Sequence, residues 1–258
     1  MAVCVAALVL AVGIPALAAE HPALAKARAL YNAADYDGAI ASAALARGPR
    51  ASTDAAALVA ARSHLERFRL RADPADLAAA RDAFAAVRAS SLSPRDQLDL
   101  LVGLGQSLYL ADNFGAAAEL FATALSRAAD LGHRDRVMLL DWWANALDRE
   151  AQRRPADRRA PVYDRVVMKM EAELRDDPGN AAANYWLAAA ARGTGDLDRA
   201  FDVAVAGWVR STLAPDTSAT IRADLDRLVT QGLIPERSRV RSARDVQAEW
   251  EAVKMQWK

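Results

Sequence analysis

The chain has 258 residues, of which 53% are hydrophobic, and it contains 12 glycines and 10 prolines. Lys and Arg together number 33, as do Asp and Glu, so the formal net charge is zero. A balanced charge provides neither the basic footprint of a nucleic-acid-binding protein nor a polybasic membrane patch, and we expect no nucleic-acid partner. No run of alternating apolar and polar residues is long enough for a sheet, so the sequence predicts an all-α protein.

The first 19 residues have the features of a secretory signal peptide. An uncharged apolar core from Val3 to Leu17 overlaps the Ala16-Leu17-Ala18 pattern and precedes Glu20, the first charged residue. The core is shorter than the roughly 20 apolar residues that a membrane span needs, and its small-residue end is typical of a cleavage site. It departs from the usual form because no Lys or Arg precedes the core, and an uncleaved anchor is the alternative. We expect cleavage after Ala18 or Ala19, a periplasmic or secreted mature protein, and no stable membrane insertion after cleavage.

Capping residues predict the helix starts in the first half of the chain. Residues 20–47 predict a helical hairpin with its turn at Asp35-Tyr36. Ser52-Thr53-Asp54 is expected to cap a helix that runs to about Leu70, because short polar side chains accept hydrogen bonds from free N–H groups. Asp73-Pro74 and Ser93-Pro94 each predict a further helix start, since proline suits the first helical turn.

The second half of the chain is also expected to be helical. One helix is expected from Arg134 to about Gln152 and its partner, after an arginine-rich loop, from Tyr163 to Arg175. Residues 216–231 predict another helix, and residues 235–242 an irregular connector. The last helix is expected to present one apolar face, formed by Val246, Trp250, Val253 and Trp257. A stack of helices needs its last apolar face covered, so this helix is predicted to be a cap.

A pattern of small residues and turns recurs along the chain. Measured from Leu104 and from Leu187, the turn residues and a following small alanine fall at identical offsets. The copies comprise Leu187-Ala188, Gly195-Asp196-Leu197 and Ala200; Leu104-Gly105, Asn113-Phe114, Ala117, Phe121 and Ala124; and Ala27, Asp35-Tyr36, Ala39, Ala43 and Ala46. A fourth copy keeps only its second helix, with Asp76-Leu77, Ala80 and Phe84.

This pattern resembles that of the tetratricopeptide-repeat (TPR) family. The resemblance implies an α-solenoid of stacked antiparallel helical hairpins, because small residues let paired helices approach and one hairpin cannot bury its apolar stripe alone. We therefore expect three parts: a cleaved signal peptide at residues 1–19, TPR-like repeats at residues 20–214, and capping helices at residues 215–258. Trp186 and Trp208 are expected to anchor the core of the last hairpin.

The first helices of TPR hairpins line a concave groove that receives peptides or partner helices. Carried over by position, the resemblance gives seven candidate partner-binding residues: Gln106, Tyr109, Asp141, Asn145, Arg149, Tyr185 and Arg192. Their mixture of aromatic, amide and charged groups suits an extended peptide. The alternative is that these residues form ordinary polar surface.

The sequence contains no pattern that predicts catalysis. His21, His64 and His133 are isolated from one another, so the common helical zinc motif is missing. Cys4, the only cysteine, lies within the predicted signal peptide, which leaves the mature chain without a disulfide or thiolate metal site. We therefore expect no catalytic residue, no bound metal and no cofactor.

The leading hypothesis is a non-catalytic scaffold of the periplasm or cell envelope that binds a protein or peptide partner. The alternative is an envelope enzyme that acts on cell-wall sugars or peptides, which requires ionisable residues converging in one pocket of a helical cleft. A third hypothesis is a helical solute-binding or lipid-carrying protein, for which a closed apolar cavity would be the sign.

Overall fold

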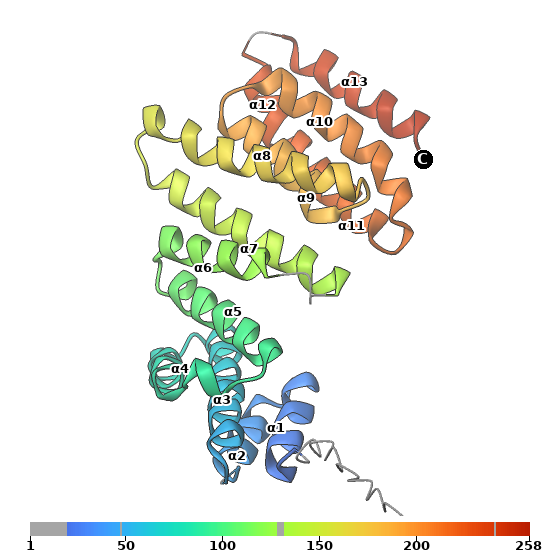
Figure 1. Cartoon of the computed structure of the whole chain (residues 1–258). Coiled ribbons are helices and arrows are strands. Elements are labelled where there is room, and N and C mark those ends of the chain that lie inside the picture. Colours follow the sequence, from blue (N-terminus) through green and yellow to red (C-terminus); the bar gives the residue numbers. More distant parts are fainter. Residues whose placement is uncertain (1–19, 47, 128–131, 240) are drawn as a thin grey trace, which may run out of the picture.

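The computed structural model describes residues 20–46, 48–127, 132–239 and 241–258 (Figure 1). The predicted signal peptide, residues 1–19, lies outside the described residues. All regular elements in the described ranges are helical, which confirms the all-α prediction. The first helices along the chain are α1 (Pro22–Asn32), α2 (Tyr36–Ala44), α3 (Arg50–Arg71), α4 (Pro74–Ala86), α5 (Pro94–Leu110), α6 (Phe114–Ser126) and α7 (His133–Gln152). They are followed by α8 (Ala160–Asp176), α9 (Ala181–Gly193), α10 (Leu197–Arg210), α11 (Pro215–Leu228), α12 (Ile234–Arg237) and α13 (Ala243–Gln256).

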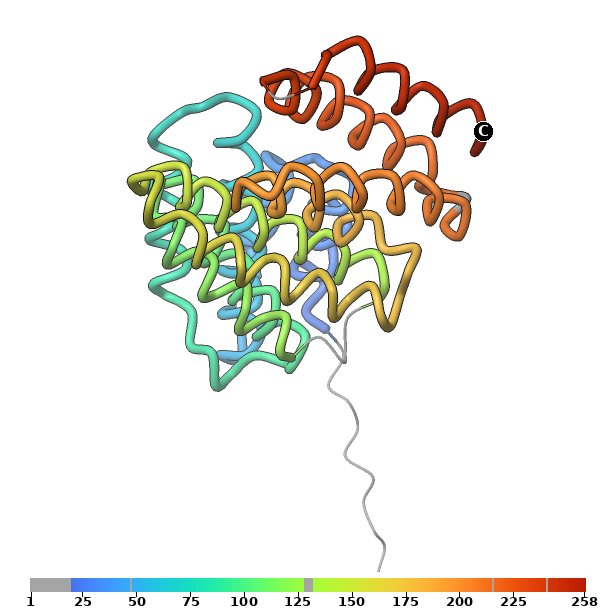
Figure 2. Tube along the Cα trace, turned by 90° about the horizontal axis from the view of Figure 1, so that it is seen from above, coloured from blue at the N-terminus to red at the C-terminus, as the bar shows by residue number. Residues whose placement is uncertain are grey.

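The helices stack in chain order, with α1 and α2 at one end of the molecule and α13 at the other (Figure 1). From α1 to α11 each helix contacts the next one. Odd-numbered helices also contact one another, α1 with α3, α3 with α5, α7 with α9, and α9 with α11. Seen from above, the last helix, in red, lies to one side of the others (Figure 2). Up to α11, one side of the stack is therefore formed by the odd-numbered helices, whereas α13 packs on α10 and α12.

Three hairpins, α1–α2, α5–α6 and α9–α10, are closed by the same turn. The residue before the second helix's N-cap has a positive φ in each: 60° at Ala34, 62° at Asp112 and 87° at Gly195. In each turn the N-cap N–H also donates to a carbonyl five residues back, a left-handed helix ending. These bonds join Asp35 to Leu30 (2.9 Å), Asn113 to Leu108 (2.9 Å) and Asp196 to Ala191 (3.2 Å). The turns lie at the positions expected from the sequence.

Missing or small side chains let the paired helices approach closely. A Cβ atom on Gly105 would lie 2.6 Å from the ring of Phe121, and one on Gly207 would lie 3.0 Å from Leu225. The matching alanines of the second helices, Ala39, Ala117 and Ala200, are fully buried. Contact between the helices at these points therefore depends on the absence of larger side chains.

The apolar core is divided into three neighbouring clusters. The first joins α1 to α5, the second joins α5 to α9, and the third joins α9 to α13. Trp186 and Trp208, the expected core anchors, are both buried. Helices α5 and α9 contribute to two clusters each, so they connect the core along the stack.

The start of α3 differs from the sequence prediction. The helix begins at Arg50 rather than after Ser52-Thr53-Asp54, and the carbonyl of Pro49 accepts hydrogen bonds from the Ser52 and Thr53 N–H groups. Asp54 does not cap the helix because its carboxylate is buried and accepts a hydrogen bond from the Ser91 hydroxyl.

The predicted irregular connector at residues 235–242 is helical in its first part. Helix α11 continues through a π-helical turn, Val229–Leu233, directly into α12. Pro235 has no N–H to donate, and a π-turn accommodates such an interruption of the hydrogen-bond ladder. Arg237 is buried, donates to Asp198 (2.7 Å) and lies over the Phe201 ring, which fixes α12 against α10.

Helix α13 contacts α10 and α12 through part of its predicted apolar face. Val246 and Trp250 are fully buried, and the Trp250 indole N–H donates to Asp226 (2.8 Å). Trp257 lies beyond the end of the helix and is 44% exposed, while its carbonyl accepts a hydrogen bond from the Trp208 indole. The apolar face of α13 was therefore predicted one residue too long, because Trp257 does not belong to the helix.

We expect Ala34→Gly to stabilise the protein by about 0.5–1 kcal/mol, because Ala34 occupies a left-handed conformation that costs any residue with a Cβ atom. The matched change Ala29→Gly, at an exposed position inside α1, should instead destabilise by about 1 kcal/mol. Urea unfolding of both variants measures the difference. Equal effects of the two substitutions would contradict the turn geometry.

Candidate functional site

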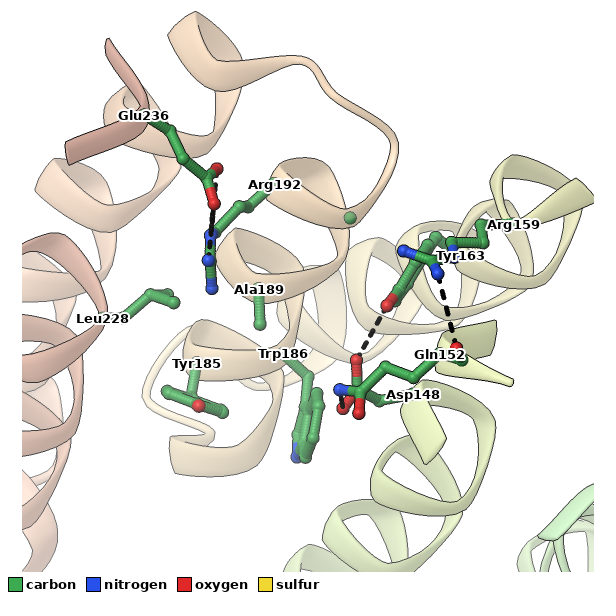
Figure 3. Close-up of a pocket in the computed structure, with 11 residues that line it drawn as sticks. Asp148, Gln152, Arg159, Tyr163, Tyr185, Trp186, Ala189, Arg192, Leu228 and Glu236 are labelled. Carbon is green, nitrogen blue, oxygen red and sulfur yellow. Dashed lines mark hydrogen bonds and ion pairs between the residues drawn. The ribbon is translucent and has the colours of Figure 1, made fainter. Parts of the chain in front are cut away.

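Two adjoining hollows open beside α9. The Asp224 hollow lies between α7, α9 and α11 and has a volume of about 380 Å³. Its lining consists of Val137, Met138, Asp141, Asn145, Ala181, Ala182, Tyr185, Trp186, Thr220, Ile221 and Asp224. The Arg192 hollow has a volume of about 440 Å³ and lies between α7, α8, α9 and the α11–α12 segment (Figure 3). It is lined by Asp148, Gln152, Arg159, Tyr163, Tyr185, Trp186, Ala189, Arg192, Gly193, Leu228 and Glu236.

Tyr185 and Trp186 of α9 belong to both hollows. The Trp186 ring is buried, and its indole N–H donates to Asp141 Oδ1 on α7 (2.8 Å). The half-buried Tyr185 ring meets the Trp186 ring edge-on, with centroids 5.1 Å apart. Two neighbouring aromatic side chains, one fixed by α7, thus connect the hollows.

An ion pair forms one wall of the Arg192 hollow. Arg192 Nε lies 3.1 Å from both oxygens of Glu236, and Nη2 lies 2.6 Å from Oε1 (Figure 3). The hydrogen bond to Glu236 raises the pKa of Arg192. A Cβ atom on Gly232, in the π-helical turn, would lie 3.0 Å from the Arg192 guanidinium carbon. The glycine at this turn therefore gives the guanidinium the space to reach Glu236.

Asp148 and Tyr163 form the opposing polar pair. The Tyr163 hydroxyl donates to Asp148 Oδ1 (2.9 Å), and the Gln152 amide donates to Oδ2 (2.6 Å). Burial raises the pKa of Asp148, while the hydrogen bond from Tyr163 lowers it. Burial and the neighbouring Asp148 charge also raise the pKa of Tyr163. Both oxygens of this carboxylate are thus engaged within the protein.

Tyr185 shares its two hollows with three aspartates, Asp141 and Asp224 in one and Asp148 in the other. Burial raises the pKa of Tyr185, and the charges of Asp224, Asp148 and Asp141 raise it further. The pKa of Asp141 is likewise raised, chiefly by burial and also by Asp224, although the bond from Trp186 lowers it. Asp141 remains exposed at the mouth of the Asp224 hollow, so its carboxylate still meets solvent. The charge of Arg192 lowers the pKa of Tyr185, but by less than each of these three carboxylates raises it.

A smaller hollow of about 240 Å³ lies between α1, α3 and α5. Its charged groups pair with one another: Arg62 with Asp99 (2.7 Å) and Arg28 with Asp96 (2.9 Å). The Arg62 guanidinium also lies 4.7 Å from the centre of the Tyr31 ring. These mutual contacts leave this hollow without an uncompensated negative charge.

The structure brings four of the seven candidate partner-binding residues to the two hollows beside α9. Asp141, Asn145 and Tyr185 line the Asp224 hollow, and Tyr185 and Arg192 line the Arg192 hollow. Tyr109 lies behind them: its hydroxyl donates to Asn145 Oδ1 (2.5 Å), and its ring packs edge-on against Trp142. Tyr109 thus positions Asn145 instead of lining a hollow itself.

Gln106 and Arg149 line neither hollow. Gln106 is half-buried on α5. Arg149 is exposed on α7, with its guanidinium carbon 5.5 Å from the centre of the Phe114 ring. Both residues lie on odd-numbered helices, but their side chains do not line the two hollows beside α9.

Several lining residues were missed by the sequence analysis. Asp148 and Tyr163 come from the α7–α8 pair, whose long connection departs from the repeat pattern, and Glu236 from a segment expected to be irregular. Asp224 lies on α11, three residues after the buried Ile221 and therefore beside its apolar face. Helical spacing from Ile221 could have found Asp224.

The described ranges contain no cluster of three or more His, Cys, Asp and Glu side chains arranged to hold a metal ion. His21 caps its own helix, accepting a hydrogen bond from the Ala23 N–H (3.2 Å). Within the same ranges, none of the helices combines the length and the apolar character that crossing a bilayer requires.

No protein-family model matches the sequence, and neither a curated protein nor a solved structure matches it significantly.

We expect Asp148→Asn to leave the free energy of unfolding at pH 7 unchanged or raised by up to about 1 kcal/mol. Burial raises the pKa of Asp148 in the folded state, so the native protein binds more protons than the unfolded chain, and stability falls as pH rises above the ordinary Asp value of about 3.9. The amide removes this dependence and still accepts the Tyr163 hydrogen bond, while the exposed Gln152 side chain can turn its own amide oxygen toward the new NH2 group.

Urea unfolding at a series of pH values measures the difference in unfolding free energy between Asp148→Asn and the unchanged protein. This difference should disappear as the pH falls below about 4. Asp148→Ala is the matched variant, because it leaves the buried Tyr163 hydroxyl without its acceptor and should cost about 1–3 kcal/mol. If Asp148→Asn lowered the free energy of unfolding more at pH 7 than at pH 4, burial would not be the main influence on the pKa of Asp148.

Proposed function

We propose that this chain is a non-catalytic scaffold that binds an extended protein or peptide segment along the odd-numbered helices of a TPR-like α-solenoid. The observation that carries the proposal is the pair of adjoining hollows beside α9 that share Tyr185 and Trp186. Aromatic side chains supply large contact area at little entropic cost, and nearby carboxylates and amides add direction. An extended segment could place successive side chains in the two hollows.

The solenoid part of the proposal is supported by the repeated geometry. Three hairpins have the same left-handed turn and the same fully buried alanine in their second helices. Odd-numbered helices contact each other along much of the stack. Closer spacing on one side of a stack of hairpins produces a concave surface on that side, which is where extended partners bind in such architectures.

The non-catalytic part is supported by the way the ionisable groups are used. In the Arg192 hollow, Arg192 is engaged by Glu236, and Asp148 by Tyr163 and Gln152. Mutually satisfied pairs of this kind hold side chains in place, whereas a general acid or base must reach a substrate. We therefore favour binding over the alternative of an enzyme acting on cell-wall sugars or peptides.

Two exposed methionines provide a matched test of the binding side. Met138 lines the Asp224 hollow and is 50% exposed, whereas Met168 on α8 is 71% exposed and lines neither hollow. Replacing each with a photoreactive p-benzoylphenylalanine and irradiating the protein in cell-envelope extract should yield discrete protein adducts from position 138. Position 168 should yield few, because an even-numbered helix carries it.

Adduct formation is measured by gel shift and mass spectrometry. Competition with unmodified protein should remove the adducts at position 138, since a specific site saturates. Equal yields from the two positions, or adducts that survive competition, would contradict a binding side on the odd-numbered helices.

We further propose that the protein acts in the periplasm or outside the cell after removal of residues 1–19. The supporting observation is the apolar core that ends in Ala16-Leu17-Ala18. Expression in a bacterial host should yield a fractionated envelope or secreted product whose mass corresponds to a start at Ala19 or Glu20. Ala16→Arg together with Ala18→Arg should block processing, because signal peptidases require small residues at these positions. A full-length cytoplasmic product would contradict export.

A further inference from the structure

We propose that the Asp224 hollow binds the cationic side chain of an arginine or lysine in an extended segment of a partner protein. This inference rests on the proposed binding function and names the chemistry of its partner. Of the residues that line the hollow, only Asp141 and Asp224 are charged, and both are acidic. They lie on two different helices, α7 and α11, both of which contact α9.

The other hollows differ in their charge, because basic side chains line each of them. The Arg192 hollow contains two carboxylates, Asp148 and Glu236, and two guanidinium groups, Arg159 and Arg192. The hollow between α1, α3 and α5 contains more arginine than aspartate. Two further hollows, of about 390 and 750 Å³, also contain basic groups: Arg154 and Arg165 in one, Arg134 and His133 in the other. Among these hollows only the Asp224 hollow is lined by carboxylates without a basic side chain, which gives a cationic group a reason to bind at this point of the surface.

The remaining lining suits the rest of a long basic side chain. Tyr185 presents a half-buried aromatic ring, which attracts a cation through its π face. The buried Ile221 and Ala182 supply apolar surface for an aliphatic stem, and the exposed Met138 adds a flexible rim. A volume of about 380 Å³ lies in the range of ligand clefts.

Two features oppose cation binding, and both are weaker than the two carboxylates. The N-terminus of α9 begins at Ala181 and lines the hollow, with a dipole equivalent to about half a positive charge. Asp224 also lies 3.3 Å from Arg227, but this pair is largely exposed, with side chains 43% and 64% accessible. Exposed pairs contribute little, so a bound guanidinium could replace this contact.

The charges that face Asp141 support the same assignment. Trp186 donates to its Oδ1 atom, and Asp224 of α11 lines the same hollow. A cation placed between the two aspartates would relieve their mutual repulsion while it gains two attractive partners. Trp186 would fix the position of Asp141 throughout.

Fluorescence anisotropy with matched peptides tests the inference. The probe is a fluorescein-labelled, C-terminally amidated peptide of alanine and serine with one central arginine, and its control contains citrulline, the neutral isostere. The arginine peptide should bind more tightly by at least about fivefold, and added salt should weaken it. Asp224→Asn should lower its affinity by about fivefold and leave the citrulline peptide unaffected.

Asp202→Asn, at an exposed position on α10, is the control substitution and should leave both affinities unchanged. Circular dichroism and the Trp186 indole N–H resonance report whether Asp224→Asn preserves the fold. Asp224→Lys should weaken the arginine peptide further, since it places a like charge in the hollow.

Equal binding of the two peptides, no binding of the arginine peptide at millimolar concentration, or an unchanged affinity in folded Asp224→Asn would overturn the inference. If photoadducts at position 138 persist while the peptides bind alike, the binding scaffold stands and the cationic partner does not. If position 138 forms no adducts and neither peptide binds, both proposals fail. Equal affinity for free argininamide would overturn the peptide part, because the flanking backbone would then contribute nothing.

Discussion

The close approach of helices within each hairpin constrains the rest of this structure. Gly105 lies directly against the Phe121 ring, and the alanines at the matching position of the second helices, Ala117 and Ala200, are fully buried. A left-handed residue before each second helix brings the chain back at the distance that these small residues allow. The orientation of α5 and α9, and with it the position of Tyr109 and Tyr185, follows from this spacing. The hollows beside α9 are thus a consequence of backbone packing more than of any local motif.

Polar contacts between neighbouring hairpins complete the site. Trp186 of α9 donates to Asp141 of α7, and Tyr109 of α5 donates to Asn145 of α7. Helix α7 therefore receives one hydrogen bond from each neighbouring first helix, and both acceptors line the Asp224 hollow. Arg192 reaches across to Glu236, and the glycine of the π-helical turn that follows α11 faces its guanidinium. The site is therefore assembled from segments that are far apart in the sequence.

Sequence patterns were informative where a local rule decides the structure. Proline after a capping residue correctly marked α4 at Asp73-Pro74 and α5 at Ser93-Pro94, and the repeated turns were found because their residues recur at fixed offsets. The expectation that a short polar side chain caps a helix failed at Asp54, where a contact with Ser91, distant in the sequence, competes with capping. Sequence patterns also did not reveal Glu236, because the π-helical turn before this residue leaves no recognisable mark in the sequence. Which polar residues share a hollow depends on the packing of four helices, and spacing within one helix does not determine it.

The division of the core into three clusters has a consequence for how the molecule comes apart. Among the described helices, only α5 and α9 contribute buried residues to two clusters, so the buried core of each end is joined to the middle mainly through one helix. Opening of α1–α4 would leave the hydrophobic contacts around Trp143 and Met170 intact, and the same holds for α11–α13. Subglobal opening from either terminus is therefore expected to require less free energy than global unfolding. The middle segment, α5–α9, carries the hydrogen-bond acceptors Asp141 and Asn145 on α7. Its backbone amide hydrogens would be the last to exchange with solvent.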